Sequence, residues 1–177
     1  MGAVALREER QALTIDSPLA VADLCSEMRF LDRECLRVVL LNAKQHLIKV
    51  CTVSQGSVNE SLAHPREVFK PAIIHPAYSF IMVHNHPSGD PSPSEADLRL
   101  TRRILEASRI LLLQLVDHVI IGAPAPGRSG YFSFKEGGVI SLDRLTSCPL
   151  QAGSCFLHSG KSSRVLHRCS VLPQVGL

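Results

Sequence analysis

The stretch His84-Asn85-His86-Pro87-Ser88-Gly89-Asp90-Pro91-Ser92-Pro93-Ser94-Glu95-Ala96-Asp97 holds the densest group of possible metal ligands in the chain. Its histidines end an apolar run that begins at Ser79, and such a run is typical of a central strand buried on both faces. A loop rich in Pro, Gly and Ser follows. Ser92-Pro93 and Glu95 then predict a helix, with Ser92 as N-cap, Pro93 in the first helical position and Glu95 in a capping box. The segment therefore predicts a strand, a polar loop and a helix.

The spacing of the three possible ligands indicates a metal site. His84 and His86 are two residues apart on a strand, so their side chains point to the same face. Asp97 shares a helix face with Leu100 and Ile104, and packing of that face on the sheet draws the carboxylate towards the strand end. Two imidazoles and one carboxylate can bind a zinc ion, leave one position open and lower the pKa of a bound water to about 7.

Each of these residues also has a purely structural interpretation. A histidine pair can form a polar strand end, and Asp97 can favour the dipole of the helix N-terminus. Ser94-x-x-Asp97 also fits a capping box. The three ligands together, joined by a turn-rich loop that brings them into range, favour the metal site.

The flanking sequence predicts the fold class. Branched apolar residues and short turns indicate strands, and Ser17-Pro18 indicates a helix start. The expected elements are a helix from 17 to about 31, strands over 34–41 and 47–54, a short helix from about 65 to 73, a strand over 79–84, a helix to about 108, and strands over 113–121 and 131–134. This order predicts an α/β (α+β) domain with a mixed central sheet flanked by helices.

Composition divides the chain unevenly. Apolar residues make up 45% of the 177 residues, enough for a packed core. Four of the 19 basic residues and none of the 16 acidic ones lie in 144–177, so the net charge of +3 belongs to this end and the remainder is near neutral. We expect a poorly ordered lead-in over 1–16, one domain over 17–141, and a basic Ser/Cys-rich tail over 142–177 that is disordered.

Charge and cysteine usage restrict location and partners. The near-neutral domain does not support strong nucleic-acid binding, although a local basic patch stays possible. No apolar run reaches the length of a membrane span, so we expect no membrane partner. The first residues lack a signal-peptide core and none of the six cysteines forms a CxxC pair, which leads us to expect a cytoplasmic protein.

The pattern His-x-His, seven residues, then Ser-x-x-Asp resembles the JAMM motif of the JAB/MPN metallopeptidase family. The full sequence of residues 84–97 resembles the RadC-like branch of this family. Three flanking segments resemble the same branch: His64-Pro-Arg-Glu-Val-Phe-Lys70, Asp117-His-Val-Ile-Ile-Gly122 and Tyr131-Phe-Ser-Phe-Lys-Glu136. The resemblance covers about 17–141. It implies a JAB/MPN, cytidine-deaminase-like architecture and one zinc ion per chain, bound by His84, His86 and Asp97.

The resemblance also implies two catalytic residues. Glu34, at the start of the first strand, corresponds to a glutamate that acts as general base on the zinc-bound water. Ser94 corresponds to a serine that stabilises the oxyanion formed when a carbonyl is attacked. A solvated glutamate and a helix-start serine are the structural alternatives for these two residues. Asp117 and His118 alternate on a buried strand, and a core role is the expectation for them.

Two functions follow from the resemblance. The first is a zinc-dependent hydrolase of peptide or isopeptide bonds, a metallopeptidase whose peptide or protein substrate the sequence does not identify. The alternative is a non-enzymatic DNA-repair or mobile-element accessory protein. The presence of all three ligands together with Glu34 favours the enzyme. Neither the substrate nor the oligomeric state can be predicted from the sequence.

Overall fold

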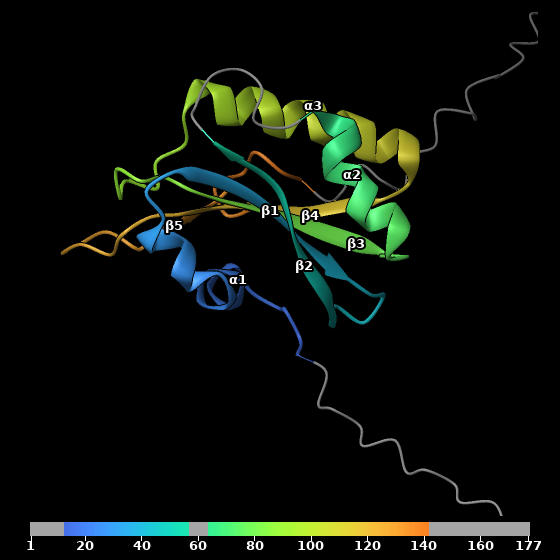
Figure 1. Cartoon of the computed structure of the whole chain (residues 1–177), viewed down its shortest axis with the longest axis horizontal. Helices are drawn as coiled ribbons and strands as arrows, with labels where there is room; N and C mark the ends of the chain where they lie inside the picture. The colour runs from blue at the N-terminus through green and yellow to red at the C-terminus, as the bar shows by residue number, and fades with distance from the viewer. Residues whose placement is uncertain (1–12, 57–63, 142–177) are drawn as a thin grey trace, which may run out of the picture. The chain divides into compact units, whose positions relative to one another are not determined.

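One mixed five-stranded sheet, in the order β2-β1-β3-β4-β5, forms the centre of the computed structural model, which describes residues 13–56 and 64–141 (Figure 1). Only β3 and β4 are parallel; every other neighbouring pair is antiparallel. The elements in chain order are α1 (Pro18–Leu24), a 3₁₀ helix (Ser26–Phe30), β1 (Glu34–Leu41), β2 (Leu47–Gly56), α2 (Pro65–Ile74), β3 (Ser79–Asn85), α3 (Glu95–Leu111), β4 (Gln114–Ile121) and β5 (Tyr131–Ser133). The mixed sheet flanked by helices confirms the predicted α/β class.

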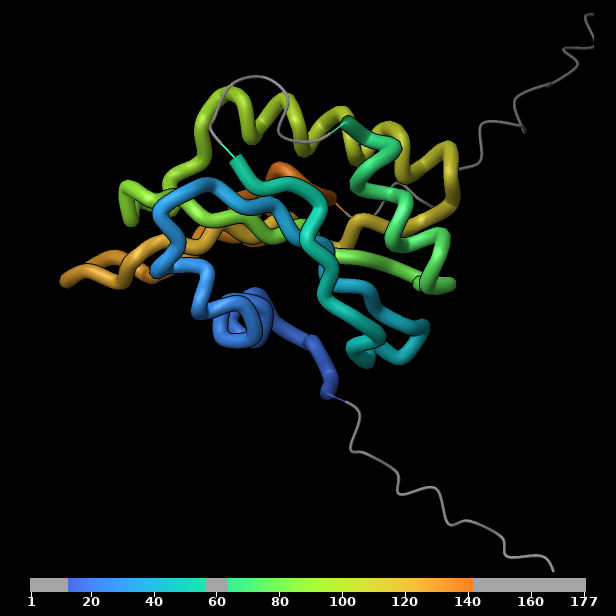
Figure 2. The backbone as a smooth tube through the Cα atoms, in the orientation of Figure 1, coloured from blue at the N-terminus to red at the C-terminus, as the bar shows by residue number. Residues whose placement is uncertain are grey.

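Helices cover both faces of the sheet. α2 and α3 lie on one face, where they pack with Leu36, Phe80 and Ile120 in one apolar cluster, and α1 with the 3₁₀ helix covers the other (Figure 1). β3 is the central strand, and all seven of its residues are buried. β1 lies directly beside it although the two strands are far apart in the chain (Figure 2). Both sides of the strand that ends in the histidines are therefore shielded from water.

The first helix is shorter than predicted. Ser17 caps it as expected, accepting a hydrogen bond from the Ala20 N–H. The α-helix ends at Leu24, however, and a 3₁₀ turn replaces the uninterrupted helix that was expected to about residue 31. Cys25 and Met28 are three residues apart and fully buried, and a turn of three residues aligns both side chains with the sheet.

The predicted start of α3 is wrong by two residues. The N-cap is Ser94, not Ser92, and Asp97 completes the capping box in place of Glu95. Ser92 is engaged elsewhere, because its N–H and hydroxyl both donate to the Asp90 carboxylate (3.0 and 2.8 Å). The helix also continues to Leu111, beyond the predicted end near 108.

Most expectations about the chain ends concern residues outside the described ranges, including the tail 142–177 and most of the lead-in 1–16. The described residues belong to one compact unit. Within them, no helix is both long and apolar enough to cross a membrane.

Candidate metal site

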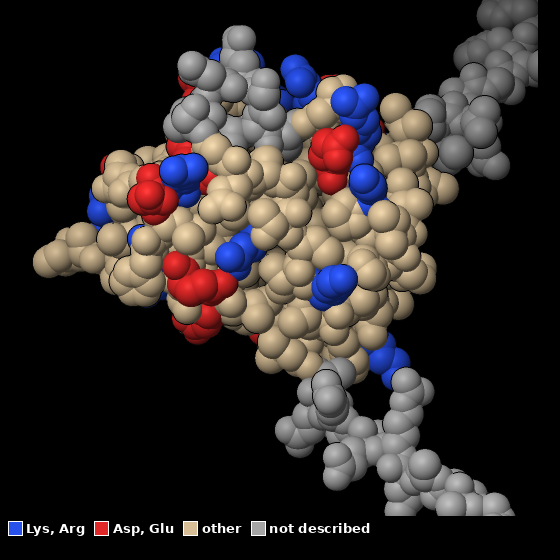
Figure 3. All heavy atoms as spheres, in the orientation of Figure 1, with Lys and Arg blue, Asp and Glu red and all other residues tan. Residues whose placement is uncertain are grey.

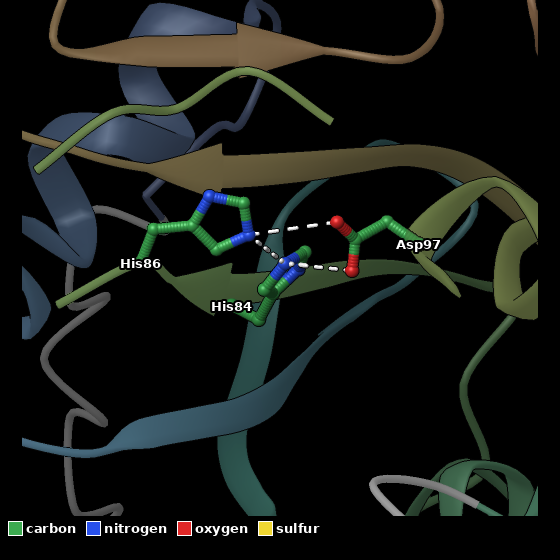
Figure 4. Close-up of side chains that lie close together, drawn as sticks. All are labelled: His84, His86 and Asp97. Atoms are coloured by element: carbon green, nitrogen blue, oxygen red, sulfur yellow. Dashed lines mark hydrogen bonds and ion pairs between the residues drawn. The ribbon is translucent and has the colours of Figure 1, made fainter. Parts of the chain in front are cut away.

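The end of β3 and the first turn of α3 bring the three predicted ligands together (Figure 4). His84 Nε2 lies 3.1 Å from His86 Nε2 and 3.2 Å from Asp97 Oδ1. His86 Nε2 lies 3.5 Å from Asp97 Oδ2. A metal with tetrahedral geometry and bonds of about 2.0–2.1 Å holds its donor atoms about 3.3 Å apart. The observed separations therefore fit one shared ion.

The hydrogen-bond partners of the two histidines assign their protons so that lone pairs face this point. The Thr101 hydroxyl donates to the Asp97 carbonyl (2.6 Å) and so accepts from His118 Nδ1 (2.7 Å). His118 Nε2 must then accept, and its partner at 2.8 Å is His84 Nδ1, which carries the proton. The Nε2 atom of neutral His84 is left with a bare lone pair at the metal position.

The same assignment applies to His86. Its Nδ1 lies 2.7 Å from the Asp90 carbonyl oxygen, which can only accept, so the proton of the neutral ring is on Nδ1. Two imidazole lone pairs and a carboxylate then converge on one point. Acceptors that face one another without a donor between them are unfavourable in a low-dielectric site, and a divalent cation would satisfy all of them. The residues present thus fit a bound metal.

Between the imidazoles and Asp97, a proton on Nε2 can take the place of a cation, and the pKa shifts of Asp97 and His86 reflect this attraction. Burial alone would raise the pKa of Asp97, but hydrogen bonds with His84 and His86 outweigh it and hold that pKa well below its usual value. The hydrogen bond with Asp97 raises the pKa of His86 despite partial burial. Complete burial lowers the pKa of His118 well below the usual value, so this ring is neutral, as the network requires. The ring is also stacked on Phe134, with centroids 4.5 Å apart.

Two loops hold the candidate ligand His86. The 86–94 loop folds back so that the Asp90 carbonyl meets the imidazole, and the 122–130 loop packs against it. Arg128 pairs with the Asp90 carboxylate (3.4 Å) and donates to the Gly89 carbonyl (3.2 Å). A Cβ atom on Gly122 would lie 2.6 Å from that same carbonyl oxygen. The close approach leaves room only for glycine at 122.

Ser94 forms hydrogen bonds with the candidate ligand Asp97. Its hydroxyl donates to Asp97 Oδ2 (2.6 Å), and its N–H donates to the same oxygen (2.8 Å). It also accepts from the Asp97 N–H (3.2 Å). These contacts orient the carboxylate. The oxyanion role of Ser94 stays a prediction.

Glu34 lies on the ligand face at the start of β1. The pair Leu36↔His84 ends the β1–β3 register, and alternation puts Glu34 on the face that Leu36 and His84 share. Glu34 is half-buried, and its negative charge contributes to the raised pKa of His86. Its placement next to the ligands is compatible with the predicted role of base, which stays a prediction.

Comparison with known proteins agrees with this geometry. The RadC-like JAB domain matches residues 15–139, which contain every residue of the site. The chain belongs to the RadC-like JAB domain family. It is 47% identical over 127 residues to a UPF0758 protein of Desulfitobacterium hafniense, a match that covers 71% of this chain and 54% of the relative. The UPF0758 protein of Moorella thermoacetica is 53% identical over 127 residues (71% and 53%), and that of Caldanaerobacter subterraneus is 46% identical over 139 residues (78% and 58%).

Coverage restricts what these relatives imply. The chain spans about half the length of the curated relatives it matches, and their names give no activity. The comparisons therefore establish the RadC-like JAB family, and the three converging side chains establish a group that could hold a metal ion.

The sequence predicted the three candidate ligands, which the structure brings together, but not the residues that support them. Asp117 and His118 do point to opposite faces, as alternation predicted, because Asp117 pairs with Ile81 and His118 with Met82. His118 is buried as expected, but it also contacts the ligand His84. Thr101 and Asn85 were not predicted as part of the site. Their positions are the only signal: Thr101 lies one helical turn after Asp97, and Asn85 lies between the two histidines.

Proposed function

We propose that this RadC-like JAB domain is a zinc-dependent hydrolase of peptide or isopeptide bonds. The observation that carries the proposal is the convergence of His84 Nε2, His86 Nε2 and an Asp97 carboxylate within 3.1–3.5 Å, with Glu34 on the same face of the sheet. Two imidazoles and one carboxylate form the ligand set of open catalytic zinc sites. A zinc ion bound there would polarise a substrate carbonyl and activate water as a nucleophile.

The chain's own residues supply the remaining steps. Glu34 takes a proton from the attacking water and passes it to the nitrogen of the leaving amine. Ser94 keeps the Asp97 carboxylate in place through its short hydrogen bond. In this proposal its hydroxyl also turns to the oxyanion that forms when the carbonyl is attacked. His118 and Asp90 hold the two imidazoles in the tautomers that ligation requires.

A role in binding nucleic acid receives less support. Basic and acidic side chains are interspersed over the face of the molecule shown in Figure 3. Proteins that bind DNA through backbone phosphates gather basic residues on the contact face. Salt-dependent DNA retention by a protein that takes up no zinc would favour the non-enzymatic alternative.

The test is digestion of an unbiased peptide library by the full chain, with and without a chelator, alongside zinc analysis. We expect about one zinc per chain, cleavage that the chelator abolishes, and recovery on adding zinc back. Glu34→Gln should keep its zinc and lose hydrolysis by at least about 10²-fold, as expected for removal of a general base. Full activity in Glu34→Gln would overturn the base assignment.

A further inference from the structure

Asn85, between the two histidine ligands, connects β3 to the start of β1. Its side chain is fully buried. Oδ1 accepts a hydrogen bond from the Cys35 N–H (2.8 Å), and Nδ2 donates to the Arg33 carbonyl (3.0 Å). These two backbone groups belong to the residues on either side of Glu34. One carboxamide therefore holds the backbone both before and after Glu34.

The Asn85 side chain continues a ladder that the main chain does not complete. The β1–β3 pairing reaches Leu36↔His84 and ends there. Beyond this pair, the carboxamide presents an acceptor and a donor to β1 much as a peptide group would. Its orientation is determined, because a flipped amide would place oxygen against the Arg33 carbonyl and N–H against the Cys35 N–H. Among natural side chains, asparagine alone combines this length with both functions.

This connection bears on where the Glu34 carboxylate points. Cys35 is buried in the cluster on the α1 side of the sheet, so its neighbour Glu34 faces the α3 side, where the metal ligands lie. A general base must stay within hydrogen-bond reach of the proton that it removes, and small displacements reduce the rate strongly. Strand ends fray unless they are held. At this end of β1, Asn85 holds the backbone from β3, the strand that ends between the two histidines.

We propose that Asn85 is a positioning residue that fixes the Glu34 carboxylate relative to the metal ligands. This inference rests on the proposed hydrolase function for its catalytic consequence, whereas the connection between the two strands is independent of it. Asn85 acts through Glu34 and touches neither the metal nor the substrate.

The experiment compares Asn85→Ala and Asn85→Asp with the wild-type chain. Asn85→Asp keeps an acceptor for Cys35 and loses the donor to Arg33. Ser79→Ala is the matched control, because Ser79 is a fully buried polar residue on the same strand whose hydroxyl has no hydrogen-bond partner in the described part of the chain. The readouts are backbone hydrogen exchange at Cys35, the visible absorption spectrum of the Co²⁺-loaded protein, and hydrolysis of a peptide identified by library digestion.

We expect the Cys35 amide to exchange about tenfold faster in Asn85→Ala, in keeping with the loss of one buried hydrogen bond. Metal uptake should persist, the Co²⁺ spectrum should shift in the same direction as in Glu34→Gln, and kcat should fall about 10- to 100-fold with KM nearly constant. Asn85→Asp should fall between Asn85→Ala and wild type. Adding Asn85→Ala to Glu34→Gln should change the spectrum and the rate no further, because the effect of Asn85 passes through Glu34.

The possible failures are separable. Unchanged Cys35 exchange in Asn85→Ala would overturn the connection itself. Faster exchange with an unchanged Co²⁺ spectrum, or effects that add to those of Glu34→Gln, would overturn the positioning role. A wild-type protein that binds Co²⁺ but cleaves no peptide would overturn the proposed hydrolase and leave the first two readouts to decide whether Asn85 positions Glu34.

Discussion

Nε2 of His118 lies 2.8 Å from Nδ1 of His84, and the direction of this hydrogen bond is fixed by a third residue. The Thr101 hydroxyl uses its proton on the Asp97 carbonyl and so accepts from His118. His118 Nε2 thereby accepts a hydrogen bond from His84 Nδ1–H, which leaves His84 Nε2 free for a metal. A ring on β4 and a hydroxyl on α3 thus determine how a ligand on β3 can act.

Removing the His118 ring should weaken metal binding. We expect His118→Leu to raise the zinc dissociation constant about 10- to 100-fold, because His84 loses the acceptor that orients it and selects its tautomer. His118→Gln, which keeps an acceptor, should lose less. Competition with a chromophoric chelator gives the constants.

Ser108→Ala is the control for loss of a buried polar group on the same side of the sheet. Ser108 is buried on α3 and donates to the Leu105 carbonyl, away from the ligands. It should lower stability by about 1 kcal/mol without changing zinc affinity. Equal zinc affinity in wild type and His118→Leu would contradict the support role of His118.

Asp97 and Ser94 make one hydrogen-bonded pair with separable functions. Asp97→Ala should lower the zinc content from one per chain to a small fraction, since it removes one of three ligands. Ser94→Ala should keep zinc and lower the free energy of unfolding by about 1 kcal/mol through loss of the helix cap. Metal analysis and urea denaturation measure the two effects.

Rate measurements on Ser94→Ala then decide its catalytic role. If its hydroxyl stabilises an oxyanion, kcat should fall by about 10²–10³-fold with zinc retained. A kcat that changes no more than the zinc content does would leave Ser94 as a helix cap and a support for Asp97 only.

Gly122 governs the packing of the two loops at His86. A Cβ atom there would lie 2.6 Å from the Gly89 carbonyl oxygen and 2.8 Å from Pro91 Cδ, and both of these atoms belong to the 86–94 loop. Gly122→Ala should therefore cost about 1–3 kcal/mol of stability and weaken zinc binding. Thermal melts with and without zinc check both effects.

Gly127→Ala provides the comparison. Gly127 has φ +75°, and no heavy atom lies within 4 Å of a Cβ atom added there. This variant therefore introduces backbone strain without displacing the 86–94 loop. It should lower the melting temperature and leave zinc affinity unchanged. A similar loss of affinity in both variants would show that the close contact at Gly122 is not what holds His86.

The convergence of the three candidate ligands could be predicted from the sequence because its geometry is local. His84 and His86 share a face through strand alternation, and Asp97 follows within one loop and one helical turn. The strand over 34–41 was predicted with the bounds that the structure gives, because its branched apolar residues stop at a turn.

The helix start and the supports of the site could not be predicted because they depend on competition and on distant register. Ser92 and Ser94 both fit a cap, but Asp90 binds Ser92 into the loop, whereas Asp97 completes a reciprocal capping box with Ser94. The contact of His118 with His84 follows from a parallel register that is shifted between Phe80 and Ile81. No local pattern in the sequence records such a shift.

The buried thiol of Cys25 predicts a loss of stability in alkali. Burial, followed by the nearby charge of Glu27, raises the pKa of Cys25 from 9.0 to about 11. Between these values the unfolded chain releases the thiol proton while the folded chain keeps it, so the free energy of unfolding falls as pH rises. The difference corresponds to about 2–3 kcal/mol over this interval. Urea denaturation from pH 8 to pH 11 should show the decline, and Cys25→Ala, which has no thiol to ionise, should show a smaller one. Parallel declines in the two proteins would mean that another group, not Cys25, titrates with unfolding.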